Sequence, residues 1–286
     1  MSNAGRVSVG DLEVDRLGFG AMRITGPGIW GPPADPARAI ALLRRAVELG
    51  VNFIDTADSY GPNVSEELIA QALAPYDGVV VATKAGLTRS GPGVWEPDGS
   101  PEHLRAALEG SLRRLGVDQI DLYQLHRPDP KVPFEESLGV FVEAQRAGKV
   151  RHIGLSNVTP EELDRALAMA EIVSVQNRFS ALDRGSQAVL DVCTKRSIAF
   201  IPWFPLAAGQ ATSGDGALAQ IAESHGATSG QIALAWLLAI SPVMLPIPGT
   251  SQIAHLEENL AAADIALSAD DLDALSRAAT AARPGR

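Results

Sequence analysis

Four residues in the first half of the chain have side chains that together could deliver a proton to a reacting oxygen: Asp55, Tyr60, Lys84 and His126. Asp55 ends the apolar run 51–54, Lys84 follows the run 79–83, and His126 follows the run 120–125. If these runs are parallel strands of one sheet, their carboxyl ends converge on a shared pocket. The spacing therefore predicts a proton-donating site at this end of the sheet.

Each of these residues also has a simple structural interpretation. Asp55 could be a turn residue, Tyr60 a half-buried aromatic, Lys84 a surface charge and His126 a hydrogen-bonded core histidine. For any one of them alone, that interpretation is favoured. Four compatible groups at the ends of three successive strands favour the catalytic one.

The elements that must position these residues follow from a repeated alternation of short apolar runs and longer helical patterns. Such alternation is typical of βα units around a parallel sheet. The predicted strands are 17–21, 51–54, 79–82, 120–124, 152–155, 172–175, 198–202 and 244–247. The predicted helices are 36–49, 65–73, 100–115, 134–147, 159–170, 186–195, 217–225, 231–240 and 252–260, with a last helix from Ser268.

Eight such units predict an α/β protein with a single (β/α)₈ TIM barrel. The alternation over 7–14 around Gly10 and Asp11 adds an N-terminal β-hairpin, and the segments near the end add extra C-terminal helices. Nothing resembles a linker, so we expect residues 1–286 to form a single domain. The segment 86–99 is predicted to be a long loop that carries Trp95.

The composition limits the partners. The formal charge is −10, from 24 Lys and Arg against 34 Asp and Glu, which disfavours nucleic acid and anionic membrane as partners. The one cysteine, Cys193, can form neither an internal disulfide nor a metal cluster. The start lacks an apolar signal, and no run is long enough to span a bilayer. We expect a cytoplasmic protein without a metal, either a monomer or a weak homo-oligomer.

The string 52–61, NFIDTADSYG, with Glu66 and Glu67 after it, resembles an aldo-keto reductase signature. The segments 154–157 (GLSN), 175–177 (VQN) and 247–259 (IPGTS to EN) resemble further segments of that family in the family's order. The resemblance covers nearly the whole chain. It implies reduction of a carbonyl to an alcohol with a nicotinamide cofactor that lies extended across the top of a barrel. Consistent with this, no G-x-G-x-x-G motif opens a helix after a strand.

Under this resemblance the four residues acquire roles. Hydride addition to a carbonyl carbon leaves negative charge on the oxygen, so an acid must supply a proton. Tyr60 would be that acid, but its pKa near 10 makes it a poor donor unless a cation stabilises the phenolate. Lys84 would be the cation and Asp55 would orient it. His126 would hydrogen-bond the substrate oxygen.

The resemblance also implies a set of cofactor-binding residues. Ser156, Asn157 and Gln176 would bind the nicotinamide carboxamide, with loop capping as the alternative, and Trp203 would stack on the nicotinamide, with a core aromatic as the alternative. Phe204 stands where many relatives have a small polar residue that touches the pyrophosphate. The whole set is Gly20, Met22, Ser156, Asn157, Gln176, Trp203, Phe204, Leu206, Ile247, Gly249, Thr250, Ser251, His255, Glu258 and Asn259.

Two positions differ from many relatives. Where those have Lys and Arg against the 2′-phosphate of NADPH, this chain has Gly249 and His255. The segment opens a helix whose free N–H groups can bind phosphate, but a histidine is only partly charged near neutral pH. Glu258 and Asn259 would meet the adenine. NADPH is the expected cofactor, and NADH is not excluded.

The expected substrate is a small carbonyl compound. Trp30, Trp95 and Phe204 predict a partly aromatic pocket for a flat or ring-bearing molecule, with Arg127 beside it. The stretches 20–33 and 247–251 are similar to bacterial pyridoxal reductases. Pyridoxal fits that pocket, while sugars, ketones and larger natural products stay open.

Two other function classes remain. The resemblance extends to potassium-channel β-subunits, so the chain could be a cofactor-binding regulatory subunit with little turnover. It could also be a barrel lyase or aldolase that uses Lys84 as a Schiff-base nucleophile. The pairing with Asp55 disfavours the lyase, because it should keep the Lys84 amine charged and poorly nucleophilic.

Overall fold

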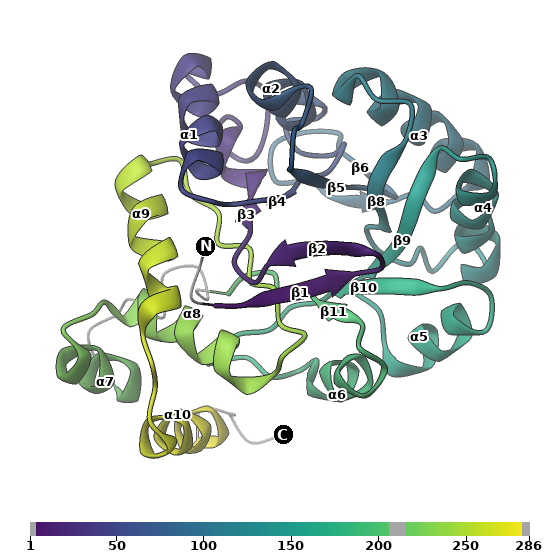
Figure 1. The fold of residues 1–286 in the computed structure, drawn as a ribbon. Coiled ribbons are helices and arrows are strands. Elements are labelled where there is room, and N and C mark those ends of the chain that lie inside the picture. The colour runs from purple at the N-terminus through teal and green to yellow at the C-terminus, as the bar shows by residue number, and fades with distance from the viewer. Residues whose placement is uncertain (1–3, 206–215, 282–286) are drawn as a thin grey trace.

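Parallel strands of this chain form a curved sheet that is surrounded by an outer layer of helices (Figure 1). The structure is a computed structural model, and it describes residues 4–205 and 216–281. The strands of the main sheet alternate with helices along the chain, as the sequence predicts. The α/β barrel architecture is therefore confirmed.

The main sheet has seven parallel strands in the order β11-β10-β9-β8-β5-β4-β3. Their bounds are β3 (Phe19–Gly20), β4 (Phe53–Asp55), β5 (Val80–Ala85), β8 (Ile120–Leu125), β9 (Val150–Ser156), β10 (Ile172–Gln176) and β11 (Ala199–Phe200). Neighbours in the sheet are also neighbours in the order of its strands along the chain, which is the arrangement that repeated βα units produce. All seven carboxyl ends consequently lie at one end of the sheet.

The segment 243–246 takes the place of the predicted eighth strand. Phe200 N donates to Val243 O at 2.8 Å, and Leu245 N donates to Phe200 O at 2.8 Å. On the other side Gly18 N donates to Pro246 O at 2.9 Å. These bonds join the last strand to the first and close the barrel. Pro246 has no N–H, so the segment forms a bridge rather than a regular ladder.

The predicted hairpin is present as β1 (Arg6–Val9) and β2 (Leu12–Asp15), paired antiparallel, and it crosses one end of the ring of strands (Figure 1). Its valines 7, 9 and 14 are buried against residues that point into the barrel. Burial of a valine side chain stabilises the fold by roughly 1.5–3 kcal/mol. The inner core consists of these valines with Phe53, Ala82, Leu122, Val173, Ala199, Ile201, Leu245 and Ile247.

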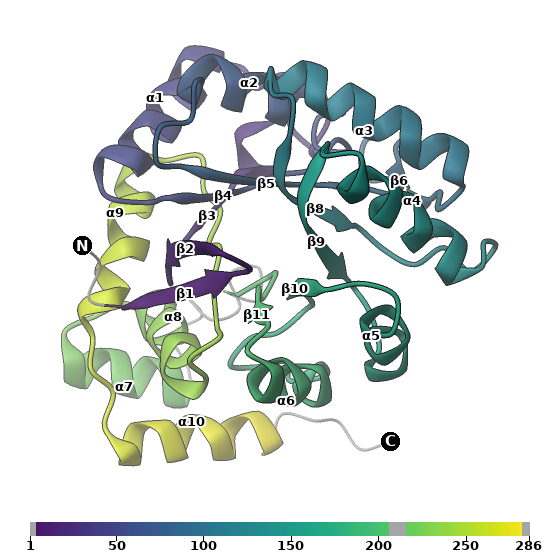
Figure 2. The same ribbon diagram turned by 45° about the vertical axis from the view of Figure 1, so that its right-hand side comes forward.

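The helices pack on the outer face of the sheet. Their bounds are α1 (Pro36–Glu48), α2 (Val64–Leu73), α3 (Pro101–Leu115), α4 (Phe134–Arg146), α5 (Pro160–Leu167), α6 (Gln187–Arg196), α7 (Ala217–His225), α8 (Ser229–Ile240), α9 (Ile253–Ala261) and α10 (Ala269–Ala281), with the short 3₁₀ helices η1 (Ala21–Ile24) and η3 (Ala262–Asp264). The extra C-terminal helices α7 and α10 lie outside the ring of strands (Figure 2). His225 of α7 contacts Asp271 of α10 at 3.0 Å.

Capping residues explain several helix starts. Asp35 caps α1 and Thr159 forms a capping box with Glu162 at α5. Thr228 and Gln231 form a second box, so α8 begins at Ser229, two residues before the predicted start. Helix α2 starts at Val64 without a side-chain cap. The preceding residue, Asn63, has a φ of 71°.

The predicted long loop 86–99 contains a short antiparallel ribbon. Its strands are β6 (Leu87–Thr88) and β7 (Glu96–Pro97). Two-residue strands are too short to produce a period-2 pattern, so the sequence offered no signal for them. The ribbon follows β5 directly, and it therefore stands at the carboxyl end of the sheet.

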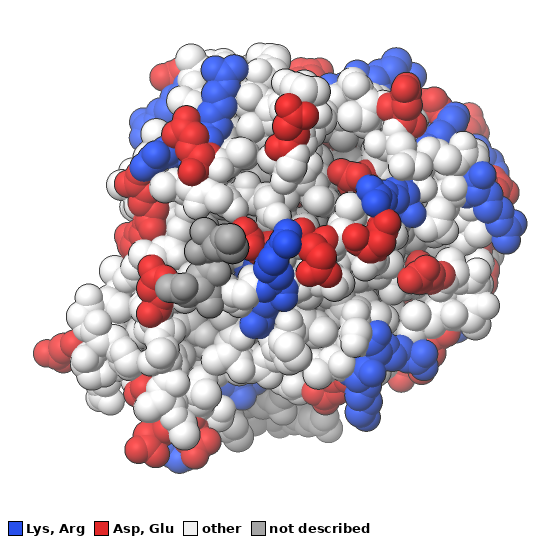
Figure 3. Space-filling model, viewed as in Figure 1, with Lys and Arg blue, Asp and Glu red and all other residues white. Residues whose placement is uncertain are grey.

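Acidic and basic side chains alternate on the face that carries the hairpin, without a large patch of one sign (Figure 3). Arg151 and His152 of β9 contact Asp11 at the hairpin tip. Surface pairs of this kind contribute little to the free energy of unfolding, typically about 0–1 kcal/mol. Among the described residues, no helix has the length and apolar character needed to cross a membrane.

Candidate active site

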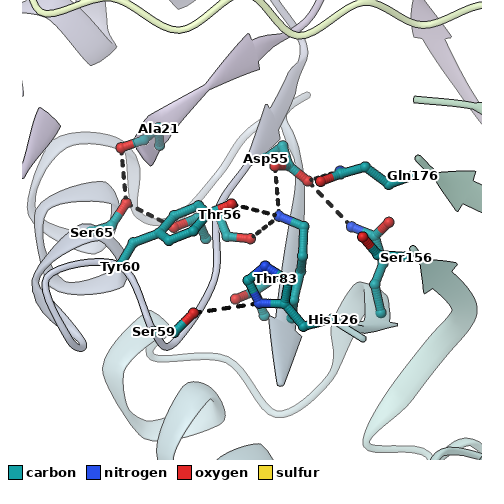
Figure 4. A network of polar contacts seen from close by, with 12 residues as sticks. Ala21, Asp55, Thr56, Ser59, Tyr60, Ser65, Thr83, His126, Ser156 and Gln176 are labelled. Atoms are coloured by element: carbon teal, nitrogen blue, oxygen red, sulfur yellow. Dashed lines mark hydrogen bonds and ion pairs between the residues drawn. The ribbon is translucent and has the colours of Figure 1, made fainter. Parts of the chain in front are cut away.

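The structure brings the four sequence-predicted residues together at the carboxyl end of the sheet. Asp55, Tyr60 and His126 are labelled in Figure 4. Asp55 is the last residue of β4, Lys84 lies near the end of β5, and His126 directly follows β8. These three strands are hydrogen-bonded neighbours. Tyr60 lies on the loop between β4 and α2, and all four residues are buried.

The Lys84 ammonium has three partners and no exposure to solvent. Nζ donates to Asp55 Oδ2 at 2.7 Å, to the Thr56 carbonyl at 2.7 Å and to the Tyr60 hydroxyl at 3.4 Å. Burial acts to lower the pKa of Lys84, but the Asp55 carboxylate and Tyr60 outweigh it and hold the pKa above its usual value. Lys84 is therefore a fixed positive charge.

The Asp55 carboxylate is held on both oxygens. Oδ2 accepts from Lys84, while Oδ1 accepts from Gln176 Nε2 at 2.8 Å and from Gln124 Nε2 at 3.2 Å. Gln124 is fully buried, two residues before His126. Sequence reasoning missed Gln124 because it lies within a strand. The sequence does not show whether a polar side chain at such a position has a partner in the site.

The Tyr60 hydroxyl points toward Lys84, between two aromatic walls. The His126 ring stands edge-on at 5.9 Å between centroids, and the Trp95 ring stands edge-on at 6.2 Å. Burial raises the pKa of Tyr60 above its usual value, Lys84 opposes that rise and Asp55 adds to it. Lys84 lowers the pKa of Tyr60, as expected, but burial has the larger effect.

His126 is neutral. Burial lowers the pKa of its imidazole well below the usual range, and the charges of Lys84 and Arg127 lower it further. Its Nδ1 lies 3.4 Å from Ser59 Oγ. A neutral imidazole keeps one N–H, so His126 can donate a hydrogen bond to an oxygen in the pocket without carrying charge.

The residues expected around the nicotinamide form a connected group at the ends of β9 and β10. Asn157 Nδ2 donates to the His126 carbonyl and to Ser156 Oγ, each at 3.0 Å, and Trp203 Nε1 donates to Asn157 Oδ1 at 2.9 Å. Asn157 has φ 59°, a left-handed conformation that asparagine tolerates. Gln176 donates to Asp55, so this group is connected to the ion pair of Lys84 and Asp55.

The glycines at 20 and 249 let two backbones approach closely. A Cβ at Gly249 would lie 2.6 Å from Gly20 O, and a Cβ at Gly20 would lie 2.7 Å from Ile247 O. This contact gives a physical reason for Gly249, because a lysine there would collide with the end of β3. Met22 lies on η1, directly after this contact.

Helix α9 starts beside the same contact. Thr250 Oγ1 accepts from Gln252 N at 3.1 Å, and no side chain caps the helix. His255 is exposed on the first turn, and Ser251 is exposed before it. Free N–H groups at a helix start suit a phosphate, and together with the glycine contact they fit the extended cofactor that the sequence implies.

The remaining residues that were expected to bind the cofactor lie in different surroundings. Glu258 already accepts from Thr228 Oγ1 at 2.7 Å, and Asn259 is buried. Phe204 has φ 66° and packs edge-on against Trp203 at 5.9 Å. Leu206 lies outside the described residues.

The pocket residues stand on three different loops. Trp95 belongs to the β6–β7 ribbon, Trp30 bridges to Gly61 near Tyr60, and Arg127 is exposed next to His126. Arg89 also lies here, with its guanidinium 3.6 Å from the centre of the Trp95 ring. Sequence reasoning missed Arg89, because it stands in a loop without a recognisable pattern.

A further buried carboxyl, that of Asp58, lies two residues before Tyr60 on the same loop. Burial, and then the charge of Glu66, hold the pKa of Asp58 well above its usual range, and Asp58 Oδ1 has no hydrogen-bond partner. Glu66 itself accepts from Arg114 Nε at 2.6 Å and from Thr83 Oγ1 at 2.6 Å. Asp58 thus belongs to a buried polar cluster in which one of its own oxygens has neither solvent nor a hydrogen-bond partner.

Asp58→Asn is expected to raise the free energy of unfolding at neutral pH. A carboxyl whose pKa is higher in the folded than in the unfolded state reduces stability as pH rises between those two values. The gain should grow from pH 4 to pH 8, because the cost of burying the ionised carboxylate grows with pH. It should vanish toward the unfolded pKa of 3.8. Urea unfolding between pH 4 and pH 8 measures it, and a gain that does not change with pH would contradict the assignment.

A family model described as "Aldo/keto reductase family" matches residues 16–280 of the chain. An oxidoreductase of Schizosaccharomyces pombe, described as uncharacterized, is 51% identical over 269 residues, which are 94% of this chain and 88% of that protein. Pyridoxine 4-dehydrogenase of Escherichia coli is 45% identical over 281 residues, 94% of this chain and 98% of that protein. The crystal structure of an aldo-keto reductase from Klebsiella pneumoniae in complex with NADPH matches with a TM-score of 0.82, at 28% identity over 99% of this chain and 96% of that one.

Proposed function

Because the chain belongs to the aldo/keto reductase family, we propose that it reduces an aldehyde or ketone to the alcohol with NADPH as the hydride donor. The observation that carries this proposal is the buried contact of Lys84 Nζ with both Asp55 Oδ2, at 2.7 Å, and the Tyr60 hydroxyl, at 3.4 Å. It places a fixed cation beside a phenol at the mouth of a barrel. That is the arrangement needed to release a proton from tyrosine at neutral pH.

In this proposal the protein moves one proton and holds one oxygen. The cofactor supplies the hydride to the carbonyl carbon. Tyr60 gives its proton to the carbonyl oxygen, and Lys84 stabilises the phenolate that is left. Neutral His126 donates a hydrogen bond to the same oxygen and fixes its direction. Asp55 keeps Lys84 in place and is itself held by Gln124 and Gln176.

The cofactor would lie over the ends of β9, β10 and β3. Ser156 and Asn157 would bind the carboxamide, and Trp203, held by Asn157, would support the nicotinamide face. Gln176 Nε2 donates to Asp55 Oδ1 at 2.8 Å, so Gln176 would bind the carboxamide through its second amide hydrogen or its carbonyl oxygen. The uncapped start of α9 would receive a phosphate, with His255 beside it.

We propose a flat, ring-bearing aldehyde as the substrate, of which pyridoxal is one. Trp95 and Trp30 form aromatic walls near Tyr60, and Arg127 offers an exposed positive charge beside His126. The similarity to pyridoxine 4-dehydrogenase supports this class, since that protein is named for the alcohol that corresponds to pyridoxal.

A panel of carbonyl compounds, assayed with NADPH and with NADH, tests the proposal. It should contain pyridoxal, benzaldehyde, a small aliphatic aldehyde, a sugar aldehyde and a cyclic ketone. We expect NADPH-dependent reduction with ring aldehydes ranked first. A low rank for pyridoxal would contradict its assignment as the substrate. Bound NADPH without turnover across the panel would favour a regulatory subunit.

His255→Arg is expected to strengthen NADPH binding by about tenfold, or 1.4 kcal/mol, because arginine pairs with phosphate in two parallel hydrogen bonds and stays charged. NADH lacks the 2′-phosphate, so its Kd should not change. Quenching of tryptophan fluorescence during cofactor titration gives both constants. Ala261→Arg adds the same charge at the exposed far end of α9 and is the matched control. An equal gain for NADH would show that the charge acts non-specifically.

A further inference from the structure

Arg89 directs every N–H of its guanidinium at a backbone carbonyl. Nε donates to Val94 O at 2.7 Å, Nη1 donates to Ile29 O and Ser59 O at 3.0 Å each, and Nη2 donates to Gly28 O at 3.1 Å and Gly91 O at 3.4 Å. These carbonyls belong to three segments: the loop after η1, the loop that leads to Tyr60, and the β6–β7 ribbon. One side chain therefore joins three walls of the pocket.

The same guanidinium also covers an aromatic face. It lies 3.6 Å from the centre of the Trp95 ring and 5.7 Å from that of Trp30. Trp95 in turn stands edge-on to Tyr60 at 6.2 Å. The row of contacts from Arg89 through Trp95 to Tyr60 sets the distance between the aromatic wall and the tyrosine.

Arg89 makes no ion pair with a carboxylate anywhere in residues 4–205 and 216–281. It is half-buried, and its contacts are all with carbonyls and indole rings. A planar fork with five donors is specific to arginine, whereas lysine has three donors around one point and cannot stack flat on an indole. The contacts thus require arginine and not merely a positive charge.

On the basis of the proposed reductase function, we propose that Arg89 is a positioning residue that sets the preference for ring-bearing carbonyl substrates by holding Trp95 in place beside Tyr60. If Trp95 is held in place before the substrate binds, binding does not have to order it. Less of the binding free energy is then lost to ordering. A small aliphatic aldehyde offers the indole less contact area than a ring does, so its reduction should depend much less on Arg89 than that of a ring-bearing aldehyde. The ribbon itself contributes few buried side chains that could hold Trp95 without it.

The test compares Arg89→Ala and Arg89→Lys with benzaldehyde and with propanal, under saturating NADPH. We expect KM for benzaldehyde to rise by about tenfold or more in Arg89→Ala, from the lost preorganisation, while KM for propanal and Kd for NADPH stay within twofold. Arg89→Lys should not restore the benzaldehyde KM. Arg44→Ala is the matched control, because Arg44 also donates to backbone carbonyls, those of Gln71 and Ala72, but on the outer helices.

A double-mutant cycle with Trp95→Ala shows whether Arg89 acts through the indole. If it does, Arg89→Ala should have little further effect on benzaldehyde KM in the Trp95→Ala background. Equal losses in both backgrounds, or equal losses for propanal and benzaldehyde, would overturn the inference.

Hydrogen exchange provides a readout that needs no turnover. In Arg89→Ala the amides of residues 28–31 and 87–97 should exchange at least about tenfold faster, while amides in the barrel strands stay unchanged. If the wild-type chain reduces no aldehyde, the proposed function fails, and this experiment still decides whether Arg89 holds the wall. Unchanged exchange in both segments would overturn that part as well.

Discussion

Tyr60→Phe is expected to lower kcat for aldehyde reduction by about 10²–10⁴-fold, the range that a positioned general acid contributes. The substitution removes one oxygen and leaves the ring between Trp95 and His126. Lys84 keeps its bonds to Asp55 and to the Thr56 carbonyl. The loss should therefore fall on kcat, with Kd for NADPH unchanged. Steady-state kinetics with benzaldehyde, together with cofactor titration, separate the two.

Tyr76→Phe is the matched control for this experiment. The Tyr76 hydroxyl donates to the Leu115 carbonyl at 2.7 Å, on the outer helices. Loss of that bond should cost about 1 kcal/mol of the free energy of unfolding and leave kcat unchanged. A Tyr60→Phe variant that keeps more than a tenth of the wild-type kcat would show that another group supplies the proton.

Lys84→Met is expected to abolish turnover and to destabilise the fold by about 3–5 kcal/mol, because it leaves the buried Asp55 carboxylate without its cation. Lys84 is fully buried and Asp55 is 2% exposed, so water cannot replace the lost partner. Urea unfolding at pH 7 measures the loss of stability, and steady-state kinetics with benzaldehyde measure the loss of turnover.

Adding Asp55→Asn to Lys84→Met should recover part of the lost stability without any recovery of activity, since the double variant buries no uncompensated charge. Lys149→Met provides the comparison with an exposed pair. Lys149 contacts Glu109, with side-chain exposures of 43% and 46%, and its loss should cost less than about 1 kcal/mol. A Lys84→Met variant as stable as Lys149→Met would show that Asp55 does not depend on the ammonium.

Much of the fold could be predicted because its signals are local. Asp35 before Pro36 and Thr159 before Pro160 start helices through contacts within one turn. The apolar runs correspond to strands because a parallel sheet covered on both sides needs continuous apolar segments. The eighth strand was the weakest match, since Pro246 removes a donor from the ladder. The prediction that residues 1–286 form a single domain stays a prediction.

Some residues of the site could be predicted from local signals and others could not. Asp55, Lys84 and His126 could be found because strand ends converge in a barrel, so a position along the chain gives a position in space. Gln124 and Arg89 could not, because their partners lie on other strands and loops whose approach no local pattern encodes. The pKa of Tyr60 was equally out of reach, since it depends on burial as well as on the neighbouring cation.

The contact between Gly20 and Gly249 limits how this chain can change its choice of cofactor in evolution. With 2.6 Å between a Cβ at 249 and the Gly20 carbonyl, no single substitution at that position can add a cation without moving β3. With the phosphate at the start of α9, as proposed, we expect gain or loss of its recognition to arise at exposed positions on the first turn of that helix, of which 255 is one. A lineage with this glycine pair would then change between the two nicotinamide cofactors through surface substitutions that leave the barrel core untouched.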